Sequence, residues 1–176
     1  WICQQCQIHE GMNILELGCG DGALWTQNLS KLPGNIHITL SDISEGMLRD
    51  ARRAIGGEDP RFSFKAFDCH NIPPRIGTFD LVIANHVLFY CDNIGKVCKN
   101  IQKVLKPQGR FLCSTYGSRH MREVSLLVQS FDERITLSGE KLYEHFGREN
   151  GRAILSPYFQ QITWQSYEDE LVVEGG

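Results

Sequence analysis

The chain has 176 residues, 41% of them hydrophobic, and its 18 Lys and Arg residues are outnumbered by 21 Asp and Glu residues. This composition excludes a disordered or low-complexity chain and predicts a single domain over residues 1–176. The net charge of −3 argues against a protein that binds nucleic acid by neutralising phosphates. No uncharged apolar run approaches the ~18 residues of a membrane span, so we expect neither nucleic acid nor a membrane as partner. The chain opens on Trp1 without a signal-peptide pattern, so we expect further residues upstream.

Seven cysteines are scattered along the chain, and several lie in apolar runs, where a free thiol packs as a small hydrophobe. Cys3 and Cys6 have the spacing of zinc ligands, but no second pair completes the ligand set of a structural site. We therefore expect a reduced, cytoplasmic protein without a bound metal.

Short apolar runs alternate with helical patterns in the first two thirds of the chain. The last helix of this region has the clearest pattern, because its apolar residues recur at helical spacing along one face. The alternation predicts an α/β fold with a doubly wound, mostly parallel sheet and helices on both faces. The expected strands are 13–17, 35–41, 61–67, 79–84 and 110–116, and the expected helices are 23–32, 44–55 and 93–106.

The last third of the chain has a different pattern. Helices are expected at 120–131, 138–146 and 148–155, and a strand at 159–167, whose pattern extends to 171–173. We interpret residues 117–157 as a helical cover over the ligand side of the sheet, because long insertions there are usually functional. The alternative is that these helices only pack against one face of the sheet.

A glycine-rich segment lies where the first strand turns into the first helix. Its glycines, in Gly18-x-Gly20-x-Gly22, allow the backbone to approach a ligand closely. Gly18-x-Gly20-x-x-Ala23 also fits the dinucleotide fingerprint of NAD-dependent oxidoreductases. From this segment alone, that function and a tight turn without a ligand both remain open.

Polar residues end the second, third and fourth expected strands. These residues are Asp42, Asp68 and the pair Asn85-His86. Ligands of open α/β sheets bind at the carboxyl ends of the strands, so these side chains are predicted to share one site. Each of them taken alone could be a helix cap or a turn former.

Taken in order, these motifs resemble those of the class I S-adenosylmethionine-dependent methyltransferases, and most of all the small-molecule, ubiquinone-biosynthesis-like group. The resemblance covers about residues 12–116. One departure is Gln108, where this group more often has Gly, and it affects only a turn. The final antiparallel strand of the family is not recognisable, so we expect it beyond residue 176 or lost by truncation. The matching motifs are Glu16-x-Gly18-x-Gly20-x-Gly22, Asp42-Ile43-Ser44, Asp68, residues 79–90 and residues 105–111.

The resemblance implies a Rossmann-like fold that binds S-adenosylmethionine and releases S-adenosylhomocysteine. By this comparison the backbone of Gly18, Cys19 and Gly20 would hold the methionine part of the cofactor. Glu16 would orient that loop and the amino group of the cofactor. Asp42 would accept hydrogen bonds from the ribose hydroxyls.

The same comparison assigns the adenine and methyl ends of the cofactor. Ile43 and Met47 would pack against the adenine. Asp68 would accept a hydrogen bond from the adenine amino group, with Cys69 alongside. Asn85 and the residue after it would line the methyl-transfer end.

The implied reaction is in-line displacement of the sulfonium methyl by a nucleophilic atom of the acceptor. Positioning and desolvation can supply most of the rate, and a general base is needed only if the acceptor loses a proton early. His86 and His120 are the catalytic candidates, although a structural role for His86 remains open. Tyr90, Tyr116 and His145 are further candidates for the base.

The expected acceptor is a small molecule or an exposed side chain. Nucleic-acid N-methylating relatives usually carry Asn-Pro-Pro-aromatic after the fourth strand, whereas this chain has Asn85-His-Val-Leu88. Two alternatives stay open: an NAD-dependent oxidoreductase, favoured only by the glycine loop, and a methyltransferase-like scaffold that binds cofactor without catalysis. The sequence does not determine the oligomeric state.

Overall fold

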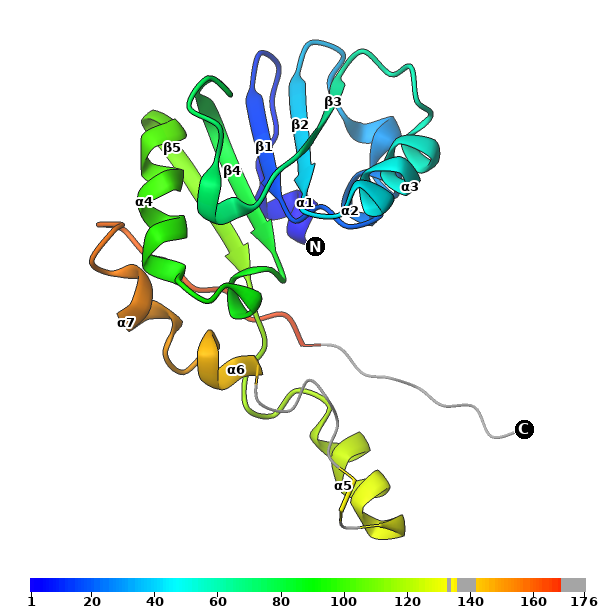
Figure 1. Cartoon of the computed structure of the whole chain (residues 1–176), viewed down its shortest axis with the longest axis vertical. Coiled ribbons are helices and arrows are strands. Elements are labelled where there is room, and N and C mark those ends of the chain that lie inside the picture. The colour runs from blue at the N-terminus through cyan, green and yellow to red at the C-terminus, as the bar shows by residue number, and fades with distance from the viewer. Residues whose placement is uncertain (133, 136–141, 169–176) are drawn as a thin grey trace.

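The centre of the molecule is a five-stranded parallel sheet with the order β3-β2-β1-β4-β5 (Figure 1). The computed structural model describes residues 1–132, 134–135 and 142–168. The strand order reverses between β1 and β4, which places the ligand end of such a sheet at the carboxyl ends of these strands. The doubly wound α/β prediction is confirmed. The strands are β1 (Asn13–Leu17), β2 (His37–Asp42), β3 (Phe62–Ala66), β4 (Phe79–Asn85) and β5 (Leu105–Ser114).

Helices cover both faces of the sheet (Figure 1). Because successive side chains of a strand point to opposite faces, Leu15 and Leu17 join the core beneath α4, while Ile14 joins the core on the other face. Both faces of β1 are therefore apolar, as is typical of a covered parallel sheet. The helices along the sheet are α1 (Ile2–Gln5), α2 (Ala23–Thr26), α3 (Glu45–Ile55), α4 (Ile94–Val104) and α7 (Gly151–Leu155).

The two longest helices on the sheet begin at capping side chains. Ser44 Oγ accepts a hydrogen bond from Met47 N at the start of α3, and Asn93 Oδ1 accepts one from Lys96 N at the start of α4. The N-terminus of α3 thus follows directly on β2 at the ligand edge, as the helix expected at 44–55 predicted.

The helix expected at 23–32 is wrong in length. The regular helix is only α2, which ends at Thr26, and a short 3-10 helix, η1 (Leu29–Lys31), follows it. The side chain of Asn28 donates to Leu24 O at 2.8 Å, and its backbone N–H turns to Trp25 O at 2.8 Å. These two bonds replace the regular α-helical bond, so the helix tightens and stops.

The fifth strand also starts earlier than expected. Leu105 already pairs with Phe79, and the register then shifts before Arg110 pairs with Leu81. Gln108, with φ of +65°, lies in the irregular stretch that absorbs this shift. The proline and glycine on either side of Gln108 suggested a break between helix and strand, whereas the structure has a bulge within the strand.

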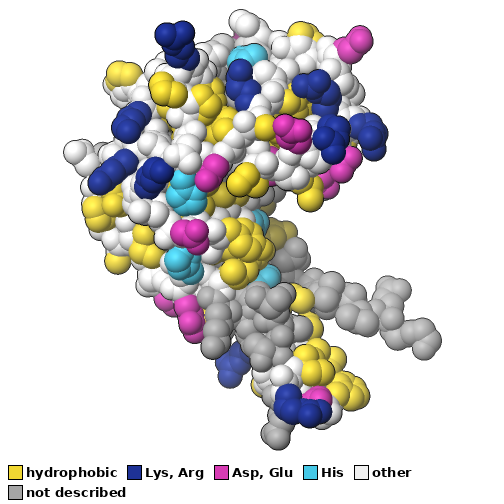
Figure 2. Space-filling model, in the orientation of Figure 1, with side chains coloured by type: hydrophobic (Ala, Val, Ile, Leu, Met, Phe, Trp, Pro, Cys, Tyr) yellow, Lys and Arg dark blue, Asp and Glu magenta, His cyan; other side chains and the backbone are white. Residues whose placement is uncertain are grey.

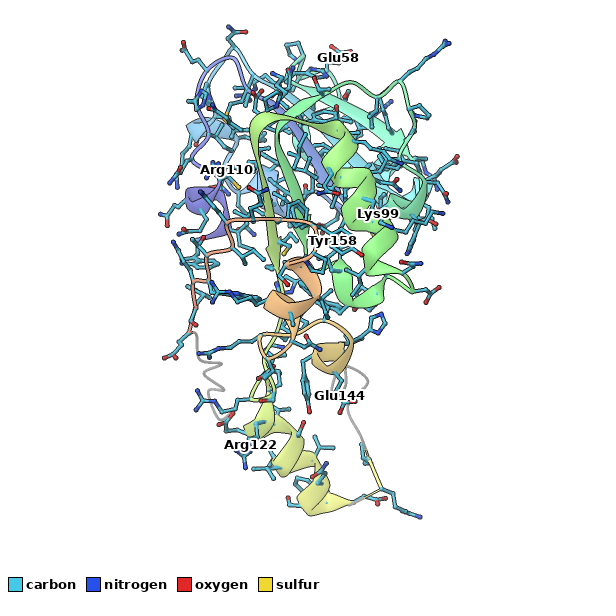
Figure 3. All side chains as sticks on the ribbon, turned by 90° about the vertical axis from the view of Figure 1, so that its left-hand side faces the viewer. Glu58, Lys99, Arg110, Arg122, Glu144 and Tyr158 are labelled. Atoms are coloured by element: carbon cyan, nitrogen blue, oxygen red, sulfur yellow. The ribbon has the colours of Figure 1, made fainter. Side chains whose placement is uncertain are left out.

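The helices of the last third lie in different places. α7 contacts α4, and α6 (Leu142–His145) contacts the short 3-10 helix η3 (Leu88–Tyr90) that follows β4. α5 (Arg122–Phe131) extends away from the sheet, as the position of Arg122 shows in Figure 3. Residues 138–141 of the expected helix 138–146 lie outside the described residues.

The strand expected at 159–167 is wrong. This segment forms no strand, and 171–173 lies outside the described residues. The Phe159 ring packs at 5.2 Å from the Phe111 ring of β5, so the segment meets a strand through a side-chain contact. Arg152 Nη2 meanwhile donates to the carbonyl of Ile162. Phe159 and Ile162 thus pack on the core, whereas Trp164 and Tyr167 are 41% and 59% exposed, so the alternation does not mark a paired strand.

Exposed apolar side chains gather on α5, the yellow cluster at the foot of Figure 2. Leu126, Leu127 and Phe131 are 56%, 60% and 83% exposed. Among the described residues, no helix combines the length and apolarity needed to cross a bilayer.

Candidate active site

The glycine loop forms the floor of the candidate site, between the ends of β1 and β4. Gly18 and Gly20 have φ of +65° and +55°, a conformation that favours glycine. A Cβ on Gly18 would lie 2.5 Å from Val87 Cγ2, so the loop packs tightly beneath the segment after β4. A Cβ on Gly20 would meet no atom within 4 Å. The loop is thus closed on one side and open on the other, where a ligand can approach its backbone.

Asp42 connects this loop to the start of α3. Its Oδ2 accepts a hydrogen bond from Gly20 N at 3.0 Å, and its Oδ1 accepts one from Ser44 N at 2.8 Å. Each carboxylate oxygen can accept a further bond, so Asp42 retains capacity for hydroxyl donors. The side chain lies at the carboxyl edge of β2, where the sequence placed it.

Glu16 lies buried beneath the loop. Its Oε2 accepts a hydrogen bond from Trp25 Nε1 at 2.5 Å. Burial raises the pKa of the Glu16 carboxyl to about 8, helped by the nearby charge of Asp42, while the bond from Trp25 acts in the opposite direction. Glu16 is therefore largely protonated near neutral pH. A cation placed above the loop would favour its charged form.

Two large apolar side chains at the edge of α3 are open to solvent. Ile43 is 74% exposed and Met47 is 46% exposed. Both lie within a few residues of Asp42, at the start of α3. This placement is consistent with contacts to a flat apolar group, and their adenine role stays a prediction.

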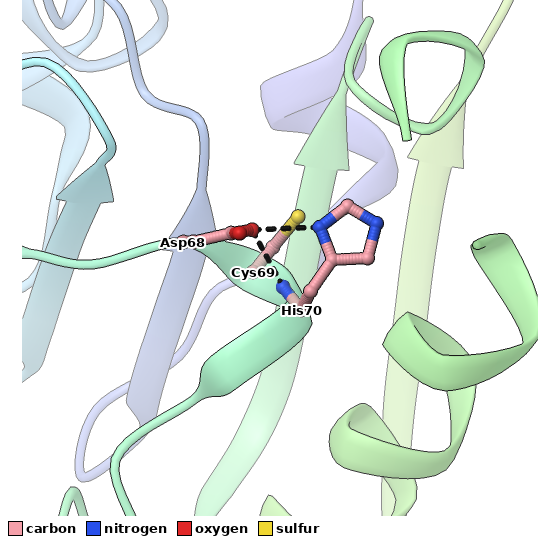
Figure 4. Close-up of side chains that lie close together, drawn as sticks. All are labelled: Asp68, Cys69 and His70. Carbon is pink, nitrogen blue, oxygen red and sulfur yellow. Dashed lines mark hydrogen bonds and ion pairs between the residues drawn. The ribbon is translucent and has the colours of Figure 1, made fainter. Parts of the chain in front are cut away.

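Asp68 and His70 form a local pair at the end of β3 (Figure 4). Asp68 Oδ1 accepts hydrogen bonds from the backbone N of His70 at 2.8 Å and from His70 Nδ1 at 2.7 Å. These bonds, the backbone one first, lower the pKa of the Asp68 carboxyl. With Cys69, the pair offers metal-ligating atoms within 4.8 Å of one another. The hydrogen bonds between Asp68 and His70 account for the proximity of these two side chains.

The two predicted cysteines have different surroundings. Cys69 Sγ lies 3.5 Å from Cys91 Sγ, and the hydrogen bond between these thiols, together with burial, raises the pKa of Cys69. Burial also raises the pKa of the Cys19 thiol. Both side chains are therefore neutral thiols, and Cys19 can serve a ligand only through its backbone.

His86 follows β4 in an unusual backbone conformation. Its φ of +56° lies in the left-handed region, and its backbone N donates to Ser114 Oγ at 3.0 Å. Its Nδ1 is buried and has no hydrogen-bond partner within the described part of the chain. Burial lowers the pKa of the imidazole, and the nearby His120 lowers it further. A half-buried, neutral imidazole whose buried Nδ1 has no partner in the described residues is unusual and is consistent with a ligand-binding role.

Three of the predicted polar aromatic side chains stack in one row. The ring of Tyr116 lies 4.6 Å from that of His86 and 4.1 Å from that of His120. The row brings residues after β4 and β5 together at the ligand edge. Tyr90 borders it through Phe89, and its side chain is 68% exposed.

His145 does not join this row. Its Nε2 lies 2.8 Å from the carbonyl oxygen of Cys91, at hydrogen-bond distance. This contact links α6 to the segment after η3. Its role in the structure is therefore the anchoring of a helix.

A family model described as a methyltransferase domain matches residues 8–175 of this chain. The chain belongs to the class I S-adenosylmethionine-dependent methyltransferases. The glycine loop is thus the loop of a methyltransferase domain, and the oxidoreductase alternative loses its only support.

Individual relatives agree with this assignment. The methyltransferase domain is 32% identical over 114 residues to a sterol 4-C-methyltransferase of Caenorhabditis elegans, covering 63% of this chain and 33% of that protein. It is 30% identical over 129 residues to a malonyl-acyl-carrier-protein O-methyltransferase of Ilyobacter polytropus, covering 73% and 49% of the two chains. The chain therefore spans less than half the length of these curated relatives.

A solved structure is similar as well. The S-adenosylmethionine-dependent methyltransferase of Mesorhizobium loti superposes with a TM-score of 0.57 at 25% identity, covering 69% of this methyltransferase domain and 55% of that chain. The similarity extends the family assignment to the three-dimensional fold.

The site of the methyltransferase domain fits S-adenosylmethionine in two observed respects. The open side of Gly20 leaves room for a ligand against the loop backbone. The carboxylate of Asp42 bonds the loop at Gly20 and keeps capacity for hydroxyl donors, and the carboxyl of Glu16 lies buried beneath the loop.

Three residues of the site were missed in the sequence. Trp25 could have been found, because a buried indole N–H normally takes a hydrogen-bond partner. Ser114 ends β5 as Asn85 ends β4, so the pattern of polar strand ends also pointed to it. Nothing in the sequence indicated that Val87 packs on Gly18.

Proposed function

We propose that this domain transfers the methyl group of S-adenosylmethionine to a small-molecule acceptor beside the stacked row of His86, Tyr116 and His120. The observation that carries the proposal is the buried Nδ1 of His86, which has no partner in the described part of the chain. It lies at the carboxyl end of β4, next to the glycine loop that Val87 contacts.

In this proposal the cofactor lies across the carboxyl ends of the strands. Its methionine part contacts Gly18, Cys19 and Gly20 above the carboxyl group of Glu16. Its ribose binds Asp42. The adenine is bordered by the side chains of Ile43, Met47, Asp68 and Cys69, and Asn85 faces the methyl end.

The bound cofactor supplies an electrophilic sulfonium methyl group. The chain contributes the alignment of the acceptor along the aromatic row and the exclusion of water from it. Burial lowers the pKa of His86, so its neutral imidazole can take the proton that the acceptor atom releases. His120 lies at the open end of the row and is the second candidate for this role.

The acceptor class rests on the surroundings of the row and on the relatives. Tyr116, stacked on the buried ring of Phe89, provides an aromatic surface that suits an apolar or planar molecule. The named relatives act on a sterol and on a malonyl group. Residues 117–157 would cover this acceptor side of the domain, with α6 already seated against η3 and α5 carrying exposed apolar side chains.

The test is transfer of a labelled methyl group from S-adenosylmethionine to a panel holding a sterol, a malonyl thioester, a phenol, a peptide and an oligonucleotide. We expect labelling of a small molecule, and a loss of about a hundredfold or more in His86→Ala with cofactor affinity retained. Labelling of the oligonucleotide alone would contradict the acceptor class. Cofactor binding without transfer to any panel member would instead favour the scaffold alternative.

A further inference from the structure

The hydroxyl of Ser114 joins β5 to the end of β4 at two points. Ser114 is the last residue of β5 and lies opposite Asn85, the last residue of β4. Its Oγ accepts the backbone N–H of His86 at 3.0 Å and donates to Asn85 Oδ1 at 2.6 Å. One small side chain thus contacts two neighbouring residues of the candidate site. Within the described residues, no other side chain makes a hydrogen bond to Asn85 or His86.

The first bond supports the conformation of His86. A residue with a Cβ rarely adopts a φ of +56°, because its side chain then crowds its own backbone. Such a conformation persists where the surroundings hold it, and it is concentrated at functional sites. The bond from His86 N to Ser114 Oγ holds the turn that places the imidazole against Tyr116.

The second bond sets the orientation of the Asn85 amide. Because Oδ1 accepts the hydroxyl proton of Ser114, the amide nitrogen Nδ2 points away from β5. Nδ2 has no hydrogen bond within the described residues. Asn85 can therefore present the N–H donors of Nδ2 to a molecule at the ligand edge, while its Oδ1 is directed toward Ser114.

We propose that Ser114 is the positioning residue of the methyl-transfer end, where it fixes Asn85 as a hydrogen-bond donor and holds His86 in its left-handed turn. This inference rests on the proposed function, because it takes Asn85 and His86 as ligand-facing residues. Ser114 itself does not touch the ligand and acts through its two neighbours.

The test compares Ser114→Ala, Ser114→Thr, Asn85→Ala and the double variant Ser114→Ala/Asn85→Ala. We expect Ser114→Ala to weaken S-adenosylhomocysteine binding by about tenfold, as Asn85→Ala does, because a freely rotating amide loses its oriented bond. The double variant should bind no more weakly than Asn85→Ala, since both changes remove the same contact. Ser114→Thr keeps the hydroxyl and should restore the wild-type affinity.

A second readout follows the His86 imidazole by NMR titration. In the wild-type protein its pKa is below the ordinary value, and Tyr116 and His120 are the titratable groups that face it. In Ser114→Ala the released turn lets the ring reach water, so its pKa should rise toward the ordinary value. Ser63→Ala, in which a half-buried strand hydroxyl also loses its bond to Thr39, is the matched control and should change neither readout.

Two kinds of result would overturn the inference. One is a Ser114→Ala variant whose melting temperature falls while its affinity for S-adenosylhomocysteine and its His86 pKa stay at the wild-type values. The other is additive loss in the double variant or failure of Thr to restore binding. A wild-type protein that binds no S-adenosylhomocysteine would refute the proposed function instead, and the His86 titration would then still decide whether Ser114 positions that residue.

Discussion

Glu16 is a carboxyl group buried beneath a loop that is built to hold a ligand. Its proton is retained in the folded state up to a pH of about 8, whereas an ordinary glutamate releases it far below neutrality. The folded state therefore binds more protons than the unfolded chain across this interval. The free energy of unfolding falls as the pH rises through it, by up to about 1.4 kcal/mol per pH unit.

This linkage predicts the behaviour of Glu16→Gln. Glutamine can still accept the bond from Trp25 but carries no charge, so the variant should be more stable than wild type at a pH of about 8 and show a flatter pH profile. Urea unfolding from mildly acidic to mildly alkaline pH measures both slopes. Identical slopes in the two proteins would show that Glu16 is not the group that titrates.

Asp42 has two structural bonds in addition to its expected ligand role. Asp42→Ala should weaken S-adenosylmethionine binding roughly ten- to a hundredfold, because bonds to a charged acceptor are worth about 1.5–3 kcal/mol. It should also lower stability, since Gly20 N and Ser44 N lose their acceptor. Affinity and melting temperature are measured on the same preparation.

Ser44→Ala is the control for this experiment. It removes the cap of α3 and should cost about 1 kcal/mol of stability while leaving affinity unchanged. If Asp42→Ala behaves in the same way, Asp42 is only a structural residue and does not bind the ribose.

At the scale of elements, the glycine loop and the segment after β4 fit each other closely. Gly18→Ala should destabilise the protein through positive φ and through contact with Val87, and the contact alone should cost about 1–3 kcal/mol. Gly11→Ala has a similar φ of +79° but no atom within 4 Å of the new Cβ, so it isolates the cost of φ.

Chemical denaturation and cofactor titration of both glycine variants test whether the contact between Gly18 and Val87 constrains the loop. We expect Gly18→Ala to be the less stable variant and the only one of the two with reduced affinity. Equal losses of stability in the two proteins would show that the Val87 contact does not constrain the loop.

The elements differ in how well the sequence predicted them. The strand at 13–17 was predicted to the residue, because a run buried on both faces carries its own signal. The segment 159–167 has alternating apolar residues instead but pairs with no strand in the described part of the chain, and alternation alone cannot show whether a segment joins the sheet.

The residues of the candidate site also differ in how well the sequence predicted them. Asp42 was predicted because it ends its own strand. The Ser114–Asn85 bond depends on the register of two strands, and the left-handed turn at His86 depends on tertiary support. Neither property is local to a short stretch of sequence, so neither could be predicted from pattern.

At the scale of the whole molecule, the residues predicted to bind the cofactor lie at one edge of the sheet. The glycine loop, the strand-end carboxylates and the stacked row lie at the carboxyl ends of neighbouring strands. The central claim is therefore that this edge binds the methyl donor of the methyltransferase family and not a nicotinamide dinucleotide.

Calorimetric titration of the protein with S-adenosylmethionine, S-adenosylhomocysteine and NAD tests that claim most directly. Binding of either sulfur compound should also raise the melting temperature, because a ligand at about a hundred times its Kd stabilises the folded state by about 2.7 kcal/mol. NAD should give neither heat nor stabilisation. Tight binding of NAD together with no response to S-adenosylmethionine or S-adenosylhomocysteine would contradict the account.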